Sequence, residues 1–186
     1  ETYAVTLVAA MVLGGLISTN EGLILYPLAL GAIAIVASIL GTFFIKLGKT
    51  QNIMGALYKG LAAAGVFAAI GFWFVTSRFA HANVDGIDDT NILWCAFLGL
   101  IITGLLIMIT EYYTATEYKP VQKLAEASES GHGTNIIAGL ALSMKATALP
   151  VLTIVLGILI AYNLAGLYGV AIAAVAMLSL TGIIVA

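Results

Sequence analysis

The chain has 186 residues, of which 62% are hydrophobic and 9% charged, and its formal net charge is −2. Soluble domains are about 45–50% apolar and about 25% charged, so this composition excludes an ordinary soluble fold and indicates membrane insertion. Nucleic acid is excluded as a partner because its recognition requires clustered Lys and Arg. The single cysteine, Cys95, excludes an internal disulfide and a multi-cysteine metal site, and its apolar surroundings predict a small buried hydrophobe.

Six apolar runs each approach the ~20 residues that a helical bilayer crossing needs. The runs cover residues 2–18, 23–45, 53–76, 92–110, 135–162 and 166–186. Helices are predicted because barrel strands alternate polar and apolar residues, whereas these runs are continuously apolar. We therefore predict an all-α integral membrane chain with about six transmembrane helices. Both terminal runs begin or end abruptly, so we expect residues 1–186 to be a partial transmembrane domain from the middle of a larger helical bundle.

Glu1 directly precedes the first run. As an isolated terminal residue it is a flanking charge and nothing more. If the native helix extends upstream, Glu1 becomes an intramembrane carboxylate, which is a candidate ion-binding group. Composition alone leaves both readings open.

Small residues recur four positions apart in several runs, a spacing that lets helix backbones approach closely. We expect these pairs to mark helix–helix contacts, although Gly and Ala are also common in membrane helices generally. The pairs are Ala10/Gly14, Ala34/Ser38, Ala37/Gly41, Gly60/Ala64, Gly65/Ala69 and Gly169/Ala173.

The distribution of basic residues predicts the orientation, because Lys and Arg concentrate in cytoplasmic loops. Arg78 stands alone on the side of loop 77–91, whereas five lysines lie on the other side: Lys46, Lys49, Lys59, Lys119 and Lys123. Loops 46–52 and 111–134 are therefore predicted to be cytoplasmic, and loop 77–91 to be external. Within the long loop, residues 124–130 are compatible with a short amphipathic helix.

Most motifs in the chain point to no chemistry. Asp85, Asp88 and Asp89 lack the ligand order of a calcium-binding loop, and a solvated acidic loop is favoured. His81 and His132 have no sequence-adjacent ligand partner and are interpreted as structural.

Two further patterns lie on apolar runs. Gly55 and Gly60 have the spacing of a phosphate-binding loop, but Leu61 replaces the required lysine. Lys145 lies ten residues into the run 135–162, where it either marks an ion path or, as we favour, extends to the cytoplasmic interface. Pro150 is expected to kink its helix or to free a backbone carbonyl.

Several strings resemble the membrane-bound pyrophosphatases, the ion-pumping inorganic diphosphatases. They begin with ETYA at 1–4 and cover essentially the whole chain. The others are TEYYT at 110–114, YKPVQ at 118–122, GHGTN at 131–135, GLA at 139–141, ATALP at 146–150 and GLYGVAIAA at 166–174. The string NIMGALY at 52–58 is most like the potassium-independent, proton-pumping bacterial branch.

The resemblance implies a translocase that hydrolyses pyrophosphate to phosphate and moves H⁺ across a bacterial inner membrane, as a homodimer with Mg²⁺ as cofactor. Its catalytic carboxylates and Mg²⁺ ligands are expected outside residues 1–186, so no catalytic, substrate-binding or metal residue is transferred. Glu1 matches the gate glutamate of the family and is the one functional residue transferred. A Na⁺ pump of the same family and a secondary transporter remain alternatives. The latter predicts discontinuous spans and an inverted repeat, and neither is clear in the sequence.

Overall fold

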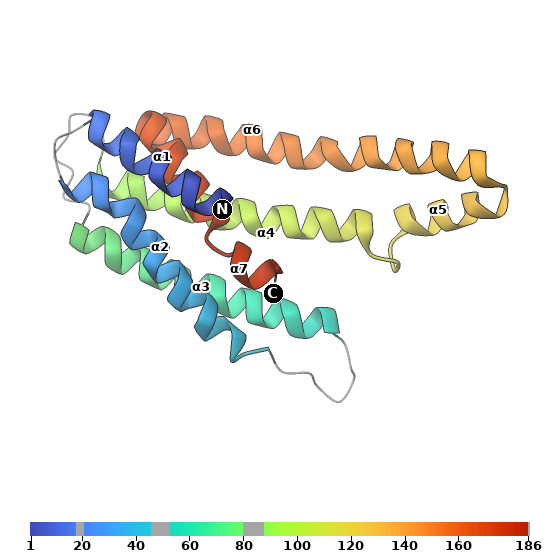
Figure 1. Cartoon of the computed structure of the whole chain (residues 1–186), viewed down its shortest axis with the longest axis horizontal. Helices are drawn as coiled ribbons and strands as arrows, with labels where there is room; N and C mark the ends of the chain where they lie inside the picture. The colour runs from blue at the N-terminus through green and yellow to red at the C-terminus, as the bar shows by residue number, and fades with distance from the viewer. Residues whose placement is uncertain (18–20, 46–52, 80–87, 186) are drawn as a thin grey trace. The chain divides into compact units, whose positions relative to one another are not determined.

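A computed structural model describes residues 1–17, 21–45, 53–79 and 88–185, and every regular element among them is a helix. This confirms the predicted all-α class. The helices are α1 (Thr2–Ile17), α2 (Glu21–Thr42), α3 (Ile53–Phe79), α4 (Asp89–Thr114), α5 (Lys119–Glu129), α6 (His132–Leu178) and α7 (Thr181–Val185), as Figure 1 shows.

The helices form two compact units. Unit 1 comprises Glu1–Ile101 and Ile158–Ala186, and unit 2 comprises Ile102–Gly157. Helices α4 and α6 each contribute one part to each unit.

Four of the described helices, α2, α3, α4 and α6, are long and apolar enough to cross a membrane. Six spans were predicted. The difference has two sources. Helix α1 has 16 residues, or about 24 Å, which is shorter than the ~30 Å hydrocarbon core. Helix α6 contains the last two predicted runs in one element of 47 residues.

Helix α6 is interrupted at Ala165 and Gly166, whose dihedral angles are not helical. Gly166 has φ +60° and ψ −149°, a backbone conformation that is essentially restricted to glycine. The first segment of α6 (132–164) and the second segment of α6 (167–178) are therefore separate helices in physical terms. Helical dihedral angles continue through Pro150, so the expected effect of that proline is limited to the loss of one N–H donor.

The predicted run 166–186 contains an interruption in the structure. The second segment of α6 ends at Leu178, and α7 begins at Thr181. The Ser179 hydroxyl donates to the Ala176 carbonyl at 2.6 Å, and the Thr181 hydroxyl donates to the Leu178 carbonyl. Serine and threonine hydroxyls can compete with backbone N–H groups for carbonyls in this way, and two such hydrogen bonds accompany the end of the helix here.

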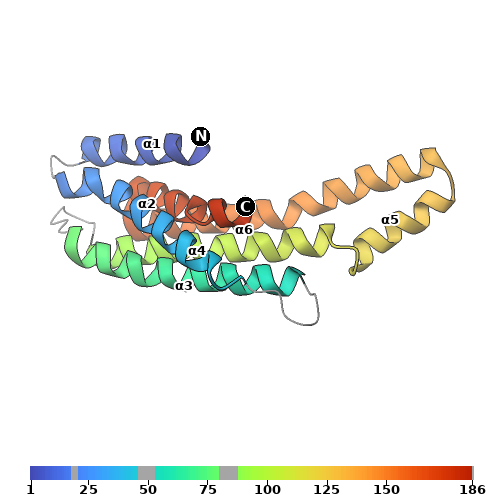
Figure 2. The ribbon, with the colours of Figure 1, turned by 60° about the horizontal axis from the view of Figure 1, so that its bottom comes forward.

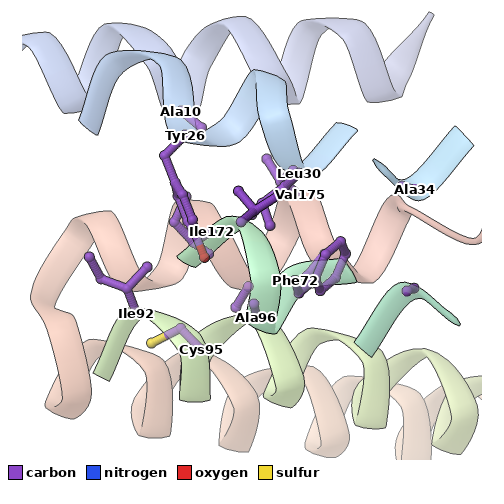
Figure 3. Close-up of a cluster of buried hydrophobic side chains, with 14 of the residues drawn as sticks. Ala10, Tyr26, Leu30, Ala34, Phe72, Ile92, Cys95, Ala96, Ile172 and Val175 are labelled. Carbon is purple, nitrogen blue, oxygen red and sulfur yellow. The ribbon is translucent and has the colours of Figure 1, made fainter. Parts of the chain in front are cut away.

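Helix α2 is central to unit 1, because it packs against α1, α3 and α7. Its buried side chains join a cluster that also receives residues from α3, α4 and the second segment of α6 (Figure 3). The labelled members are Ala10, Tyr26, Leu30, Ala34, Phe72, Ile92, Cys95, Ala96, Ile172 and Val175. The helices of unit 1 therefore share one hydrophobic core.

The small-residue pairs mark helix contacts, as predicted, where α1 and α3 meet α2. A Cβ placed on Gly14 would lie 2.8 Å from the carbonyl oxygen of Leu23. A Cβ placed on Gly41 would lie 2.6 Å from the Cβ atom of Ala64. Such distances leave no room for a larger residue, so these helices approach with their backbones close together.

Two buried hydrogen bonds connect α2 to its neighbours. Thr76 of α3 donates its hydroxyl to the Phe72 carbonyl, so Tyr26 must donate to Thr76 across 2.8 Å. Tyr168 of α6 donates to the Leu23 carbonyl at 2.7 Å. The residue four positions after Leu23 is Pro27, which has no N–H, so the Leu23 carbonyl lacks its usual helical donor. The Tyr168 hydroxyl takes the place of that donor.

Unit 2 contains the end of α4, the short helix α5 and the start of α6. Figure 2 shows α5 beside the first turns of α6, and Leu124 lies on that side, near Gly139. Helix α5 is longer than the predicted stretch 124–130, because Pro120 in its first turn favours helix initiation. Gly157 of α6 lies against Ile102 of α4, so these helices are in direct contact.

Candidate functional site

A pocket of about 500 Å³ lies in unit 1, between the start of α1, the second half of α2 and the break between α6 and α7. In the ribbon of Figure 1, the N-terminal end of α1 and helix α7 are drawn near each other. Ten residues form its lining: Glu1, Thr2, Tyr3, Ile35, Ser38, Ile39, Leu178, Ser179, Thr181 and Gly182. The pocket thus brings together Glu1, the predicted gate residue, and the interruption that the sequence did not predict.

The lining combines one carboxylate with several hydroxyl groups. Glu1 is the only charged residue among the described residues that line the pocket. The hydroxyls of Ser38, Ser179 and Thr181 come from α2, the α6–α7 break and α7, respectively. A single negative charge surrounded by neutral oxygen atoms suits a cation or a proton-donating occupant and disfavours an anion.

Each of these groups has a defined position on a helix. The Glu1 carbonyl accepts the Val5 N–H at 3.1 Å, so Glu1 lies at the start of the hydrogen-bond ladder of α1. Ser38 is half-buried on α2, four residues before that helix ends at Thr42. Helix α7 packs on α2, which brings Thr181 to the same pocket.

The depth of the pocket in a bilayer follows from the predicted crossing by α2. Ser38 is seventeen residues after Glu21, which corresponds to about 25 Å along α2. It is only about 6 Å from the end of α2 at Thr42. A hydrocarbon core of about 30 Å that follows α2 would therefore contain the pocket, closer to the end of α2 that the lysine distribution predicts to be cytoplasmic.

Lys145 lies in unit 2 and does not contribute to this pocket. Its side chain is exposed on the first segment of α6. Starting from the contact between Ile102 and Gly157, Glu111 is about 14 Å along α4 and Lys145 about 18 Å along α6 in the same direction. Lys145 therefore lies near the level at which α4 ends, which is the position expected for a lysine at the membrane interface.

The structure describes some of the remaining sequence candidates. Cys95 is buried and its Sγ lies 3.8 Å from the Ala161 carbonyl, as expected of a packing residue. His132 is exposed at the start of α6. His81 and Asp85 lie outside the described residues. In the part of the chain that is described, no group of three or more His, Cys, Asp and Glu side chains is arranged to hold a metal ion.

These described residues therefore do not fit Mg²⁺, whose sites combine carboxylates with substrate phosphates. The expectation that the Mg²⁺ ligands lie elsewhere in the protein stays a prediction.

Sequence reasoning found Glu1 but missed the hydroxyl groups around it. The signal available in the sequence was SLTG at 179–182, a run of small and hydroxyl residues within an apolar stretch. In the sequence, Ser38 stands out only as the partner of Ala34 in a pair of small residues. Its place in the pocket depends on a contact between helices that are distant in the sequence.

Comparison with known proteins decides the family. The sequence profile described as inorganic H⁺ pyrophosphatase matches residues 1–186. The chain belongs to the inorganic H⁺ pyrophosphatase family. This confirms the resemblance read from the strings of the sequence.

Relatives within the inorganic H⁺ pyrophosphatase family are closely similar to this member. This chain is 48% identical over 175 residues to pyrophosphate-energized proton pump 2 of Rhizobium leguminosarum bv. trifolii. The alignment covers 89% of this chain and 80% of the relative. This chain is 42% identical over 195 residues to the K(+)-insensitive pyrophosphate-energized proton pump of Methanosarcina mazei. That alignment covers the whole of this chain and 28% of the relative. A pyrophosphate-energized proton pump of Anaplasma marginale is 48% identical over 142 residues, covering 72% of this chain and 99% of the relative.

Proposed function

We propose that this chain is part of a pump that couples the hydrolysis of inorganic pyrophosphate to the movement of H⁺ across a membrane. The observation that carries the proposal is the family match over all 186 residues. The apolar helices α2, α3, α4 and α6 supply the multi-pass membrane domain that such a pump requires.

Protons are the favoured cargo because the relatives from Rhizobium, Methanosarcina and Anaplasma are all named as proton pumps. The name of the Methanosarcina relative also supports activity without K⁺. A secondary transporter would predict discontinuous helices, and the break between α6 and α7 is one. That break does not outweigh a family match over the whole chain.

Catalysis is assigned to parts of the protein outside this chain. Pyrophosphate hydrolysis with Mg²⁺ requires carboxylates that converge on the metal and basic groups that bind phosphate oxygens. The described residues offer no such cluster of acidic side chains. A protein as long as the Methanosarcina relative has room for these groups, since this chain aligns with 28% of it. We expect residues 1–186 alone neither to hydrolyse pyrophosphate nor to pump.

Glu1 is the proposed ion gate. Its position at a pocket of membrane depth supports this role, because a carboxylate there can take up a proton from one side and release it to the other. The Glu1→Ala substitution in the full-length protein should therefore abolish acidification of vesicles, with or without loss of hydrolysis. Pumping at the wild-type rate by this variant would show that the assignment is wrong.

The proposed protein is a homodimer in a bacterial inner membrane, with loops 46–52 and 111–134 in the cytoplasm. Lys59, Lys119 and Lys123 are exposed, which is compatible with this orientation. The exposed apolar side chains of α6, such as Ile137 and Met144, are compatible with a lipid or a subunit contact. Chemical cross-linking of the full-length protein in native membranes tests the dimer, which predicts a product of twice the monomer mass.

A further inference from the structure

The geometry points to a shared proton site in which Glu1 acts together with the hydroxyls of Ser38, Ser179 and Thr181. We call these three the pocket hydroxyls. This inference rests on the proposed function and on the proposed role of Glu1, and it adds residues on α2, on α7 and between α6 and α7. In this site the pocket hydroxyls accept hydrogen bonds from the protonated Glu1 carboxyl group or from waters that carry the proton.

The hydrogen-bond directions of two pocket hydroxyls support this assignment. Ser179 donates its proton to the Ala176 carbonyl, and Thr181 donates its proton to the Leu178 carbonyl. A hydroxyl has one proton and two acceptor lone pairs, so each of these groups can only accept from an occupant of the pocket. Toward Ser179 and Thr181, an occupant must therefore be a donor. A water, a hydronium ion and a protonated carboxyl group can donate, whereas a carboxylate cannot.

The break between α6 and α7 supplies a second reason. The second segment of α6 runs about 18 Å from Leu167 to Leu178, so its end lies within the hydrocarbon core. Non-helical backbone is tolerated at that depth only where it is buried in protein or lines a water-filled cavity. Here the interruption lines the pocket, and Ser179 and Thr181 satisfy two of the carbonyls at the helix end. The C-terminal end of a helix also favours positive charge nearby, and residues at the end of α6 line the pocket.

The size of the pocket fits a hydrated proton path. Its volume of about 500 Å³ exceeds by an order of magnitude the ~30 Å³ that one water occupies in the liquid. Waters in the pocket would have polar partners on three helical elements, which ordered buried water needs. In the proton-transfer step, an O–H bond of a hydronium ion breaks and a new O–H bond forms on the Glu1 carboxylate, which leaves a neutral water. Release reverses both changes.

The test compares hydroxyl variants of the full-length protein in sealed vesicles. Pyrophosphate hydrolysis and vesicle acidification are measured on the same preparation, and their ratio gives the coupling. The double variant Ser38→Ala/Thr181→Val should lower the ratio at least threefold. Thr181→Ser retains the hydroxyl and should keep the wild-type ratio. Thr42→Val is the matched control, because Thr42 also lies on α2 but donates to Ile39 and is absent from the lining.

Each outcome has a distinct meaning. If the wild-type protein hydrolyses pyrophosphate without acidifying vesicles, the proposed function fails. If the wild type pumps and the double variant keeps the ratio of Thr42→Val, the shared proton site is overturned while the function stands. A parallel fall of hydrolysis and pumping at constant ratio also overturns it, because that pattern reports a structural defect. Should the double variant not accumulate in the membrane, Ser38→Ala alone decides, since it leaves the α6–α7 break untouched.

Discussion

Removing the Tyr168 hydroxyl tests how unit 1 compensates for a proline inside a membrane helix. Tyr168→Phe deletes the 2.7 Å hydrogen bond to the Leu23 carbonyl and changes no carbon atom of the ring. Both residues are 1% exposed, so water cannot replace the lost donor. Pro27 prevents α2 from supplying a donor of its own.

The magnitude follows from the unsatisfied carbonyl. A buried acceptor left without a partner costs about 1–3 kcal/mol. Hydrogen bonds between membrane helices average about 0.6 kcal/mol and reach about 1.7, because polar groups find other partners when helices separate. The Leu23 carbonyl has no such partner within its helix, so we expect about 1.5 kcal/mol, near the upper end.

The assay is reversible unfolding of the full-length protein in mixed micelles, with the free energy of unfolding extrapolated to zero denaturant. Tyr162→Phe is the matched control, because Tyr162 lies in the first segment of α6, is 56% exposed, and its change should cost almost nothing. In a Pro27→Ala background the new N–H can reach the Leu23 carbonyl, and the cost of Tyr168→Phe should fall to about 0.5 kcal/mol. An equal cost of Tyr168→Phe in both backgrounds would refute the reasoning.

Two further predictions concern a backbone position and the orientation. Gly166→Ala should lower the free energy of unfolding by about 1–3 kcal/mol, because Gly166 has φ +60° in a region that alanine avoids. The helical control Gly104→Ala has open space around the new Cβ and should be neutral or stabilising by up to ~1 kcal/mol in the same unfolding assay. A cysteine introduced by Lys123→Cys should react with a membrane-impermeant maleimide only after cells are permeabilised; labelling of intact cells would reverse the predicted topology.

The helical class could be read from the sequence because hydrocarbon leaves a single segment no other way to satisfy its backbone. The end of the fifth run was placed near residue 162, close to the observed interruption at Ala165 and Gly166. There a polar residue, Asn163, and a glycine stand out against the apolar background. The close approach of α1 and α2 at Gly14 was equally visible, since four-residue spacing of small residues is a local signal.

The second interruption was invisible to the same reasoning. Ser179 and Thr181 barely lower the hydropathy of the run 166–186, and their effect on the helix depends on which carbonyl each hydroxyl selects. The role of Pro27 was also missed, because the donor that replaces its N–H lies on Tyr168, far along the chain.

The sequence also predicted only part of the candidate site. Glu1 was identified through family strings rather than through composition, which left its role open. The pocket around it is created by packing of α7 on α2, a contact between distant segments that no local pattern encodes. Ser38 and Thr181 therefore entered the account only with the structure.

Pyrophosphate-driven acidification of sealed vesicles containing the full-length protein tests the central proposal most directly. The proposed proton pump should acidify the vesicle interior when pyrophosphate and Mg²⁺ are added outside, in buffers that contain neither Na⁺ nor K⁺. Dissipation of the gradient by a protonophore should abolish the signal and leave hydrolysis intact. Hydrolysis without acidification under every combination of Na⁺ and K⁺ would contradict the proposal.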